Sequence, residues 1–262
     1  MTPEELRAVG LRLDVDGAVA TLTLDRAAKR NSQSPSMWRA MTALSQDLSD
    51  DVRVVIVRGD GPTFSAGLDT SLLMPGGSDG QEAVSDLLTQ DDEQISITIG
   101  EYQDGFRWLR DPNIVSIAVV QGYAIGAGFQ LALSCDLIVA ADNAQFCMKE
   151  PALGLVPDLT GTKPLVDRVG YSRALEIVAT ARMVGAEEAA RMGITNQVVP
   201  EADLDAAVDT LVAALTVPLP GAVRESKALL QGASDTDLET QCRLEREAQV
   251  RRFREMAALM GA

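Results

Sequence analysis

The stretch from Asn113 to Cys135 contains no charged residue, and this constrains the fold more than any other feature of the chain. By length and lack of charge it could be taken for a membrane span. Polar residues and glycines interrupt it, however, at Gln121, Gly122, Gly126, Gly128 and Gln130. Its apolar part, 114–120, has the length of a buried strand, and a glycine-rich turn follows. We therefore expect a core strand and no membrane partner.

The segments around this strand indicate an α/β protein. A short helix is expected in "GAGFQLALS" and another strand in "DLIVAAD", which is the strand–helix–strand order of a parallel sheet. Upstream, "LRLDVDGAVATLTLD" alternates apolar and polar residues on both sides of Asp16 and Gly17, as a β-hairpin does. Pro35 should open a helix that runs to about Ser49, and "VRVVIVRG" should form a buried strand.

The rest of the chain is expected to be mostly helical. We predict a loop at 76–80, a helical stretch over 81–109, and helices from Thr160 onward with no linker or internal repeat. These later helices are expected at 164–169, 172–181, 186–192, 202–215, 222–230 and 236–260.

The net charge and the composition limit the classes of partner that this chain is expected to bind. The formal net charge of −15 should repel nucleic acid and anionic membranes. Three cysteines match no zinc or disulfide spacing, and residues 1–10 lack the apolar run of a signal peptide, so a cytoplasmic protein is expected. Histidine is absent, which excludes serine–histidine and cysteine–histidine catalysis and histidine-bound metals.

Two glycine-bearing loops, "FSAGLD" (64–69) and "GYAIGAGFQLA" (122–132), each follow a predicted strand region. Small residues let a ligand approach the main chain, and the second loop leads into a helix whose first N–H groups lack internal acceptors. Such donors can hold an oxyanion. Either loop alone is more simply explained as a tight strand-to-helix turn. "GAGFQL" also lacks the third glycine of a dinucleotide-binding fingerprint.

Taken together, these loops, with "RAAKRNS" before them and "EPALGLVPDLTGT" after them, resemble the enoyl-CoA hydratase/isomerase (crotonase) family in order and spacing. The resemblance extends from about Leu11 to Phe253. It implies a crotonase-like fold of repeated β-β-α units over 1–200. It also implies a C-terminal helical region, 201–262, that packs on the core and on neighbouring subunits, in a homotrimer or a dimer of trimers.

The resemblance also implies an active site. The backbone N–H groups of Leu68 and Ala127 correspond to the donors that bind the thioester oxygen as it becomes an enolate. Glu150 matches the family's proton-transferring glutamate, and burial should raise its pKa. Without the surrounding motifs, Glu150 would be explained as a surface carboxylate before Pro151.

Two positions depart from the hydratase pattern. Gln130 stands where hydratases have a second glutamate, so it can position water but cannot take its proton. Asp158 stands where hydratases commonly have glycine and dienoyl-CoA isomerases have aspartate. It could equally cap the following helix. These departures favour double-bond isomerisation, with trans-2-enoyl-CoA hydration as the alternative. A third hypothesis is a non-catalytic acyl-CoA-binding protein.

An acidic protein needs local positive charge to bind an acyl-CoA thioester. The resemblance makes Arg26, Lys29 and Arg30 candidates for phosphate contact, although Ala27 replaces the proline usual after the arginine. Further coenzyme A contacts are expected at Ala66 and Asp69 in the first glycine loop, and at Lys227 in a C-terminal helix. No cofactor is expected other than the coenzyme A of the substrate.

Overall fold

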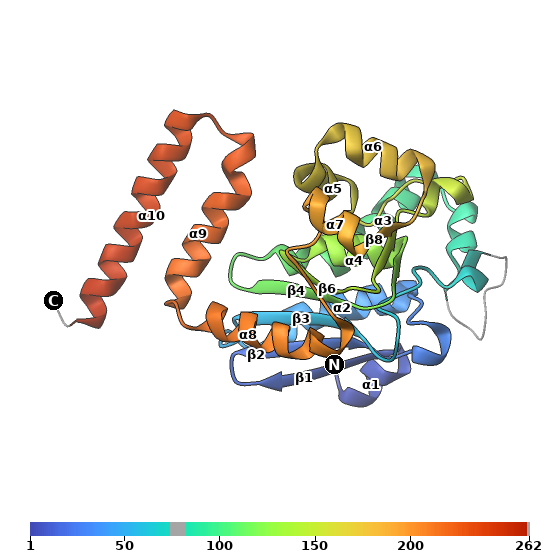
Figure 1. The fold of residues 1–262 in the computed structure, drawn as a ribbon, viewed down its shortest axis with the longest axis horizontal. Helices are drawn as coiled ribbons and strands as arrows, with labels where there is room; N and C mark the ends of the chain where they lie inside the picture. Colours follow the sequence, from blue (N-terminus) through green and yellow to red (C-terminus); the bar gives the residue numbers. More distant parts are fainter. Residues whose placement is uncertain (74–81, 261–262) are drawn as a thin grey trace.

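The computed structural model describes residues 1–73 and 82–260 and is built on a six-stranded sheet (Figure 1). Its strands lie in the order β1-β2-β3-β4-β6-β9. The first two pair antiparallel as the predicted hairpin, and the remaining neighbours pair parallel. The strands are β1 (Leu11–Asp16), β2 (Val19–Leu24), β3 (Val54–Gly59), β4 (Val115–Val120), β6 (Leu137–Ala141) and β9 (Gln197–Val199).

Both faces of this sheet are covered. Along β3, Val55 and Val57 belong to the main core with α2 (Pro35–Asp47), α3 (Asp92–Arg107) and α4 (Ala127–Ser134), whereas Val54 and Ile56 pack against α8 (Leu204–Thr216). Successive side chains of a strand point to opposite faces, so a sheet covered on both sides needs continuous apolar strands. This explains the run "VVIV" and confirms the predicted α/β class.

A second, three-stranded sheet was not predicted. It consists of β5 (Tyr123–Ile125), β7 (Gln145–Cys147) and β8 (Val184–Gly185), with β7 in the middle. Strands of two or three residues are too short to show an alternating pattern. This small sheet matters for function because β5 leads directly into α4.

The predicted helical stretch over 81–109 is divided in the structure. Its described part contains a 3-10 turn, η3 (Val84–Thr89), then α3, then η4 (Trp108–Arg110). Asp91 starts α3 by accepting a hydrogen bond from the Gln94 N–H, which is typical of an N-cap. The predicted loop at 76–80 lies outside the described residues. The first helix, α1 (Pro3–Ala8), was also missed.

The predicted C-terminal helices are confirmed with small shifts at their ends. Besides α8 they are α5 (Thr162–Val169), α6 (Tyr171–Thr180), α7 (Ala186–Met192), α9 (Pro220–Gly232) and α10 (Leu238–Leu259). The remaining 3-10 turns are η1 (Ala27–Lys29), η2 (Thr70–Leu73), η5 (Glu150–Leu153), η6 (Glu201–Asp203) and η7 (Ala233–Asp235).

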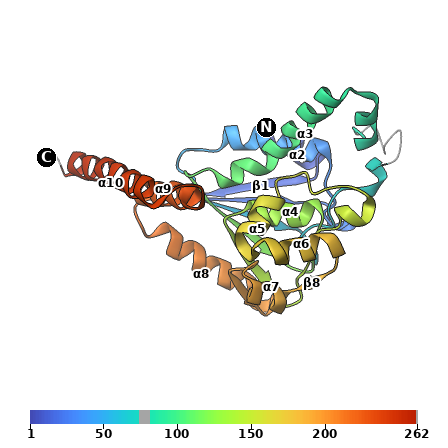
Figure 2. The same ribbon diagram turned by 90° about the horizontal axis from the view of Figure 1, so that it is seen from above.

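The α9 and α10 helices form a hairpin that projects away from the sheets (Figures 1 and 2). Large apolar side chains on it are exposed, including Leu230, Leu238 and Phe253. Among the described helices no single one is long and apolar enough to cross a membrane. One bent pair of segments, Glu201–Thr216 and Pro220–Asp235, meets that test jointly at an angle of 102°.

Candidate active site

The two glycine-bearing loops lie side by side at the carboxyl ends of β3 and β4. The Ser65 N–H donates to the Tyr123 carbonyl at 2.8 Å, and the Ile125 N–H donates to the Ser65 carbonyl at 3.0 Å. Gly67 has φ +85°, and a Cβ there would lie 2.4 Å from the Ile125 carbonyl oxygen and 3.4 Å from the Ala127 nitrogen. Glycine is therefore required at this contact between the loops.

Two unpaired N–H groups result from this arrangement. Ala127 is the first residue of α4, after Gly126 with φ +53°, and the first N–H groups of a helix have no intrahelical acceptor. Within residues 1–73 and 82–260, neither the Leu68 nor the Ala127 N–H donates a hydrogen bond. The loops thus present backbone donors near the start of a helix, which suits an anionic oxygen.

A buried polar network supports the first loop. The Ser65 hydroxyl accepts from Gln33 Nε2 at 3.0 Å and from the Gly67 N–H at 3.2 Å, and it donates to the Asn31 carbonyl at 2.8 Å. Trp38 Nε1 fixes Gln33 by donating to its Oε1 at 2.8 Å. These supporting residues were not predicted, because their partners are far apart in the sequence.

Glu150, the first residue of η5, places a carboxylate beside the start of α4. Its side chain is nearly buried, and Oε1 accepts a 2.6 Å hydrogen bond from Gln130 Nε2. A Cβ on Gly126 would lie 3.2 Å from Glu150 Oε1. Among the described residues, Oε2 of Glu150 has no hydrogen-bond partner. One carboxylate oxygen is therefore held by Gln130, and the other is buried without a partner among the described residues.

Burial is the main cause of a raised pKa at Glu150. Hydrogen bonds from the backbone and from Gln130 oppose the rise in the pKa, and the negative charge of Asp158 adds to it. A raised pKa suits a group that must both take up and release a proton near neutral pH.

Gln130 is fully buried on the first turn of α4 and contacts a second segment. Its Oε1 accepts hydrogen bonds from the Leu159 N–H at 2.8 Å and the Gly161 N–H at 3.1 Å. Because two donors occupy this oxygen, the amide nitrogen must face Glu150. Gln130 therefore acts as a donor toward Glu150 and as an acceptor toward the loop at 158–161.

Asp158 does not cap the following helix, so that alternative is wrong. Gly161 is the N-cap of α5, which begins at Thr162, and no side chain caps it. The Asp158 carbonyl accepts from Gln103 Nε2 at 2.7 Å, which ties the loop to α3. Burial raises the pKa of the Asp158 carboxyl, and its charge is near enough to affect Glu150.

Most of the predicted coenzyme A contacts line one cavity of about 730 Å³. Lys29 and Arg30 are exposed, and they border this cavity together with Leu68. Several of the other lining residues were not predicted from the sequence. The cavity lining includes Lys29, Arg30, Ser32, Ala66, Leu68, Asp69, Thr70, Ser71, Tyr123, Ile125 and Met183.

Arg26 and Asp69 hold this cavity in shape. Arg26 Nη2 lies 3.1 Å from Asp69 Oδ2, and its Nη1 donates to the Ser32 carbonyl at 2.7 Å. Partial burial works against ionisation of Asp69, but hydrogen bonds from Ser71 and Arg26 lower its pKa overall. Arg26 is thus paired with Asp69. Lys29 Nζ also lies 3.8 Å from Asp69 Oδ2, but the Lys29 side chain is exposed, as is that of Arg30.

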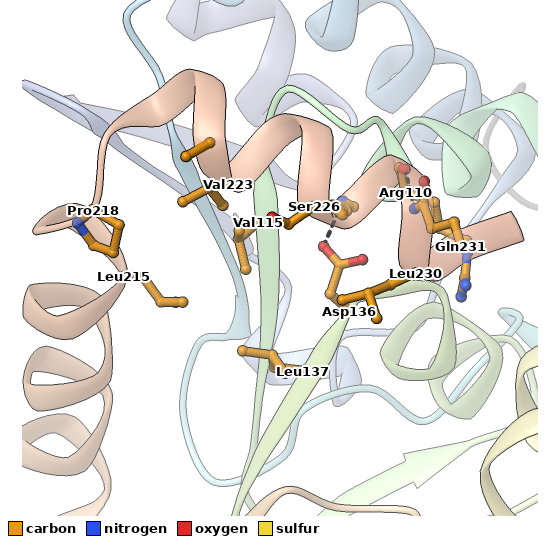
Figure 3. Close-up of a pocket in the computed structure, with 12 residues that line it drawn as sticks. Arg110, Val115, Asp136, Leu137, Leu215, Pro218, Val223, Ser226, Leu230 and Gln231 are labelled. Atoms are coloured by element: carbon orange, nitrogen blue, oxygen red, sulfur yellow. Dashed lines mark hydrogen bonds and ion pairs between the residues drawn. The ribbon is translucent and has the colours of Figure 1, made fainter. Parts of the chain in front are cut away.

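Lys227 lies apart from the other predicted contacts, on α9. Its Nζ donates at 2.7 Å each to the carbonyls of Asp111 and Ile114 and to Asp136 Oδ2. Asp136 lines a separate cavity, whose volume is about 550 Å³. Figure 3 shows this cavity and the position of Asp136 beneath α9. Three hydrogen bonds occupy the ammonium group of Lys227, which anchors α9 to the segments just before β4 and β6. The structure does not bring it to the active site.

Similarity to known proteins identifies the family of this chain. The family model described as enoyl-CoA hydratase/isomerase matches residues 14–261. The protein belongs to the enoyl-CoA hydratase/isomerase family. The protein is an enzyme of this family.

Relatives of this enoyl-CoA hydratase/isomerase family member agree in sequence and fold. A Thermobifida fusca protein described as an enoyl-CoA hydratase, solved in complex with acetoacetyl-CoA, is 50% identical with a TM-score of 0.94, over 97% of this chain and 98% of that one. Carnitinyl-CoA dehydratase of Escherichia coli is 33% identical, covering 87% and 83% of the two chains. Short-chain-enoyl-CoA hydratase of Clostridium acetobutylicum is 29% identical, covering 90% and 86%. The crotonase-like fold is confirmed.

Proposed function

We propose that this family member acts on an unsaturated acyl-CoA thioester and stabilises its enolate with the N–H groups of Leu68 and Ala127. Both donors are unpaired in the described chain, and Leu68 borders the cavity that Lys29 and Arg30 flank. The Thermobifida fusca relative binds acetoacetyl-CoA, whose thioester carbonyl could receive such donors. The thioester oxygen would lie between the loops and the phosphates toward the two exposed cations.

Glu150 is the proposed proton carrier. Its Oε2 is buried and unpartnered among the described residues, whereas Oε1 is held by Gln130. In an isomerisation, the carboxylate would remove a proton from the carbon next to the thioester. The negative charge would spread to the thioester oxygen, and the protonated carboxyl group would then deliver a proton to a more distant carbon. No cofactor beyond the coenzyme A of the substrate is needed for this step.

We favour double-bond isomerisation, and the contacts of Gln130 are the observation that carries this choice. A hydratase of this family uses two glutamates, whereas Gln130 has no proton-accepting group and both of its amide ends are occupied. Asp158 is a second carboxylate near Glu150. It would serve a more distant carbon of a longer conjugated substrate.

Hydration of a trans-2-enoyl-CoA is the second candidate, favoured by the names of the relatives. A non-catalytic acyl-CoA-binding protein is the third. A buried carboxylate with a free oxygen argues against the third candidate, because burial of an unused charge costs stability.

Measurements on a panel of CoA thioesters distinguish these three candidate functions. The rates to compare are water addition to trans-2-enoyl-CoA thioesters and conversion of 3-enoyl-CoA thioesters, with dissociation constants for the same compounds. We expect conversion of the 3-enoyl compounds to be faster than hydration. Faster hydration would favour the second candidate. Binding without turnover of any compound would favour the third.

We further propose that α9 and α10 mediate assembly into a homotrimer or a dimer of trimers. The support is the projecting hairpin, in which α10 packs on α9 and large apolar side chains are exposed. A cytoplasmic location remains a proposal from the sequence.

A further inference from the structure

The loop at 158–161 has a strained conformation, and the buried side chain of Gln130 contacts it at two backbone N–H groups. Thr160 has φ +70°, in the left-handed region that β-branched residues rarely adopt. This conformation turns the N–H groups of Leu159 and Gly161 toward the same point, where Gln130 Oε1 accepts both. The cost of the strain must be offset by these contacts.

Two further features show that the loop fits Gln130 closely. A Cβ on Gly161 would lie 2.6 Å from Gln130 Cγ, so the backbone approaches the side chain to a distance that only glycine allows. The Thr160 hydroxyl lies 2.8 Å from the Ser134 hydroxyl, which in turn donates to the Gln130 carbonyl at 2.8 Å. The loop is thus attached to both the side chain and the backbone of Gln130.

We infer that Gln130 is a positioning residue that holds the two carboxylates of the site in a fixed relation. Its amide nitrogen fixes Glu150 Oε1, and its amide oxygen fixes the loop that carries Asp158. This inference rests on the proposed role of Glu150. Gln130 stands where hydratases of the family have a second glutamate. Its function here would be to position other groups, without transferring a proton or activating water.

The inference predicts a particular change in the pH dependence of kcat. The N–H donor of Gln130 stabilises the ionised form of Glu150, so its loss should raise the pKa of Glu150. A general base loses activity as pH falls through its pKa, so the acidic limb of the profile should move to higher pH. The other titratable side chains coupled to Glu150 are Asp158 and Cys147.

Two substitutions of Gln130 distinguish the role of its amide nitrogen from that of its amide oxygen. Gln130→Met removes donor and acceptor together, and we expect kcat to fall about tenfold or more with the acidic limb shifted upward. Gln130→Glu keeps an acceptor for the loop but places a second carboxyl against Glu150. We expect it to fold as the native protein does and to shift the limb further upward, because like charges raise a pKa.

Gln121→Met is the matched control, since Gln121 is also a buried glutamine that holds a loop, through the carbonyls of Gly59 and Gly61. It should lower stability and leave the limb in place. The decisive variant is Gln130→Met, or Gln130→Glu if Gln130→Met does not fold. The inference is overturned if this variant leaves the acidic limb unmoved while Glu150→Gln is inactive. Full activity of Glu150→Gln would instead overturn the proposed function.

Discussion

Gln130 Nε2 donates a 2.6 Å hydrogen bond to Glu150 Oε1, while Glu150 Oε2 has no partner within the described residues. The two oxygens of one carboxylate therefore have different environments. A held oxygen fixes the orientation of the group, and an unpaired oxygen can accept a proton from a substrate. The proposed chemistry depends on this difference.

Ala127→Pro should remove one oxyanion donor and lower turnover about a hundredfold or more. Ala127 is the first residue of α4, a position where proline is compatible with a helix, so α4 should still form. Ala127→Gly keeps the N–H group and is the matched control. Circular dichroism checks the fold of both variants. Unchanged turnover in a folded proline variant would remove Ala127 from the mechanism.

Lys29→Ala and Arg30→Ala should each raise KM for the CoA thioester with little change in kcat. Both side chains are exposed beside the cavity, and exposed charges contribute at most ~1 kcal/mol, or up to about fivefold in affinity. The effect should shrink in high salt. Arg107→Ala, which removes an exposed cation on α3, is the control. An equal KM change in that control would show a general charge effect.

The sequence predicted those parts of the fold and of the site that depend on residues close together in the chain. The strand at 115–120 and the turn around Gly67 follow from hydrophobic runs and glycine spacing, and the resemblance to the family pointed to Glu150. Contacts between distant segments were not predictable in this way. The hydrogen bonds from Gln130 to the loop at 158–161, and the anchoring of Lys227, depend on which side chains the fold brings together.

Glu150→Gln should stabilise the protein at neutral pH. The folded state raises the pKa of Glu150, so it binds the proton more tightly than the unfolded state does. The native protein therefore loses stability as pH rises from the unfolded pKa to the folded pKa, and the loss persists above that window. The glutamine that replaces Glu150 in the variant does not ionise, so the variant keeps the free energy of unfolding that the native protein loses. Its melting temperature should therefore exceed the native value by a few degrees at pH 7, the shift expected for roughly 1 kcal/mol of unfolding free energy. The two proteins should converge near pH 4. A native protein that is more stable than the variant at pH 7 would contradict this.

The native protein should form assemblies of three or six chains. Phe253 on α10 and Leu230 on α9 are exposed in the single chain, and burying such side chains between subunits would stabilise an assembly. Phe253→Glu should weaken association, whereas the exposed polar substitution Arg243→Gln on the same helix should change it little. Light scattering at micromolar concentration measures the mass. A monomeric native protein would refute the prediction.

Proton exchange tests the role of Glu150 most directly. The measurement is deuterium incorporation into a 3-enoyl-CoA and its product in D₂O, for the native protein and for Glu150→Gln, with the affinity for acetoacetyl-CoA measured in parallel. We predict that the variant binds acetoacetyl-CoA as the native protein does, while exchange and conversion fall by about 10² to 10⁴. Native rates of exchange and conversion in Glu150→Gln would contradict the account.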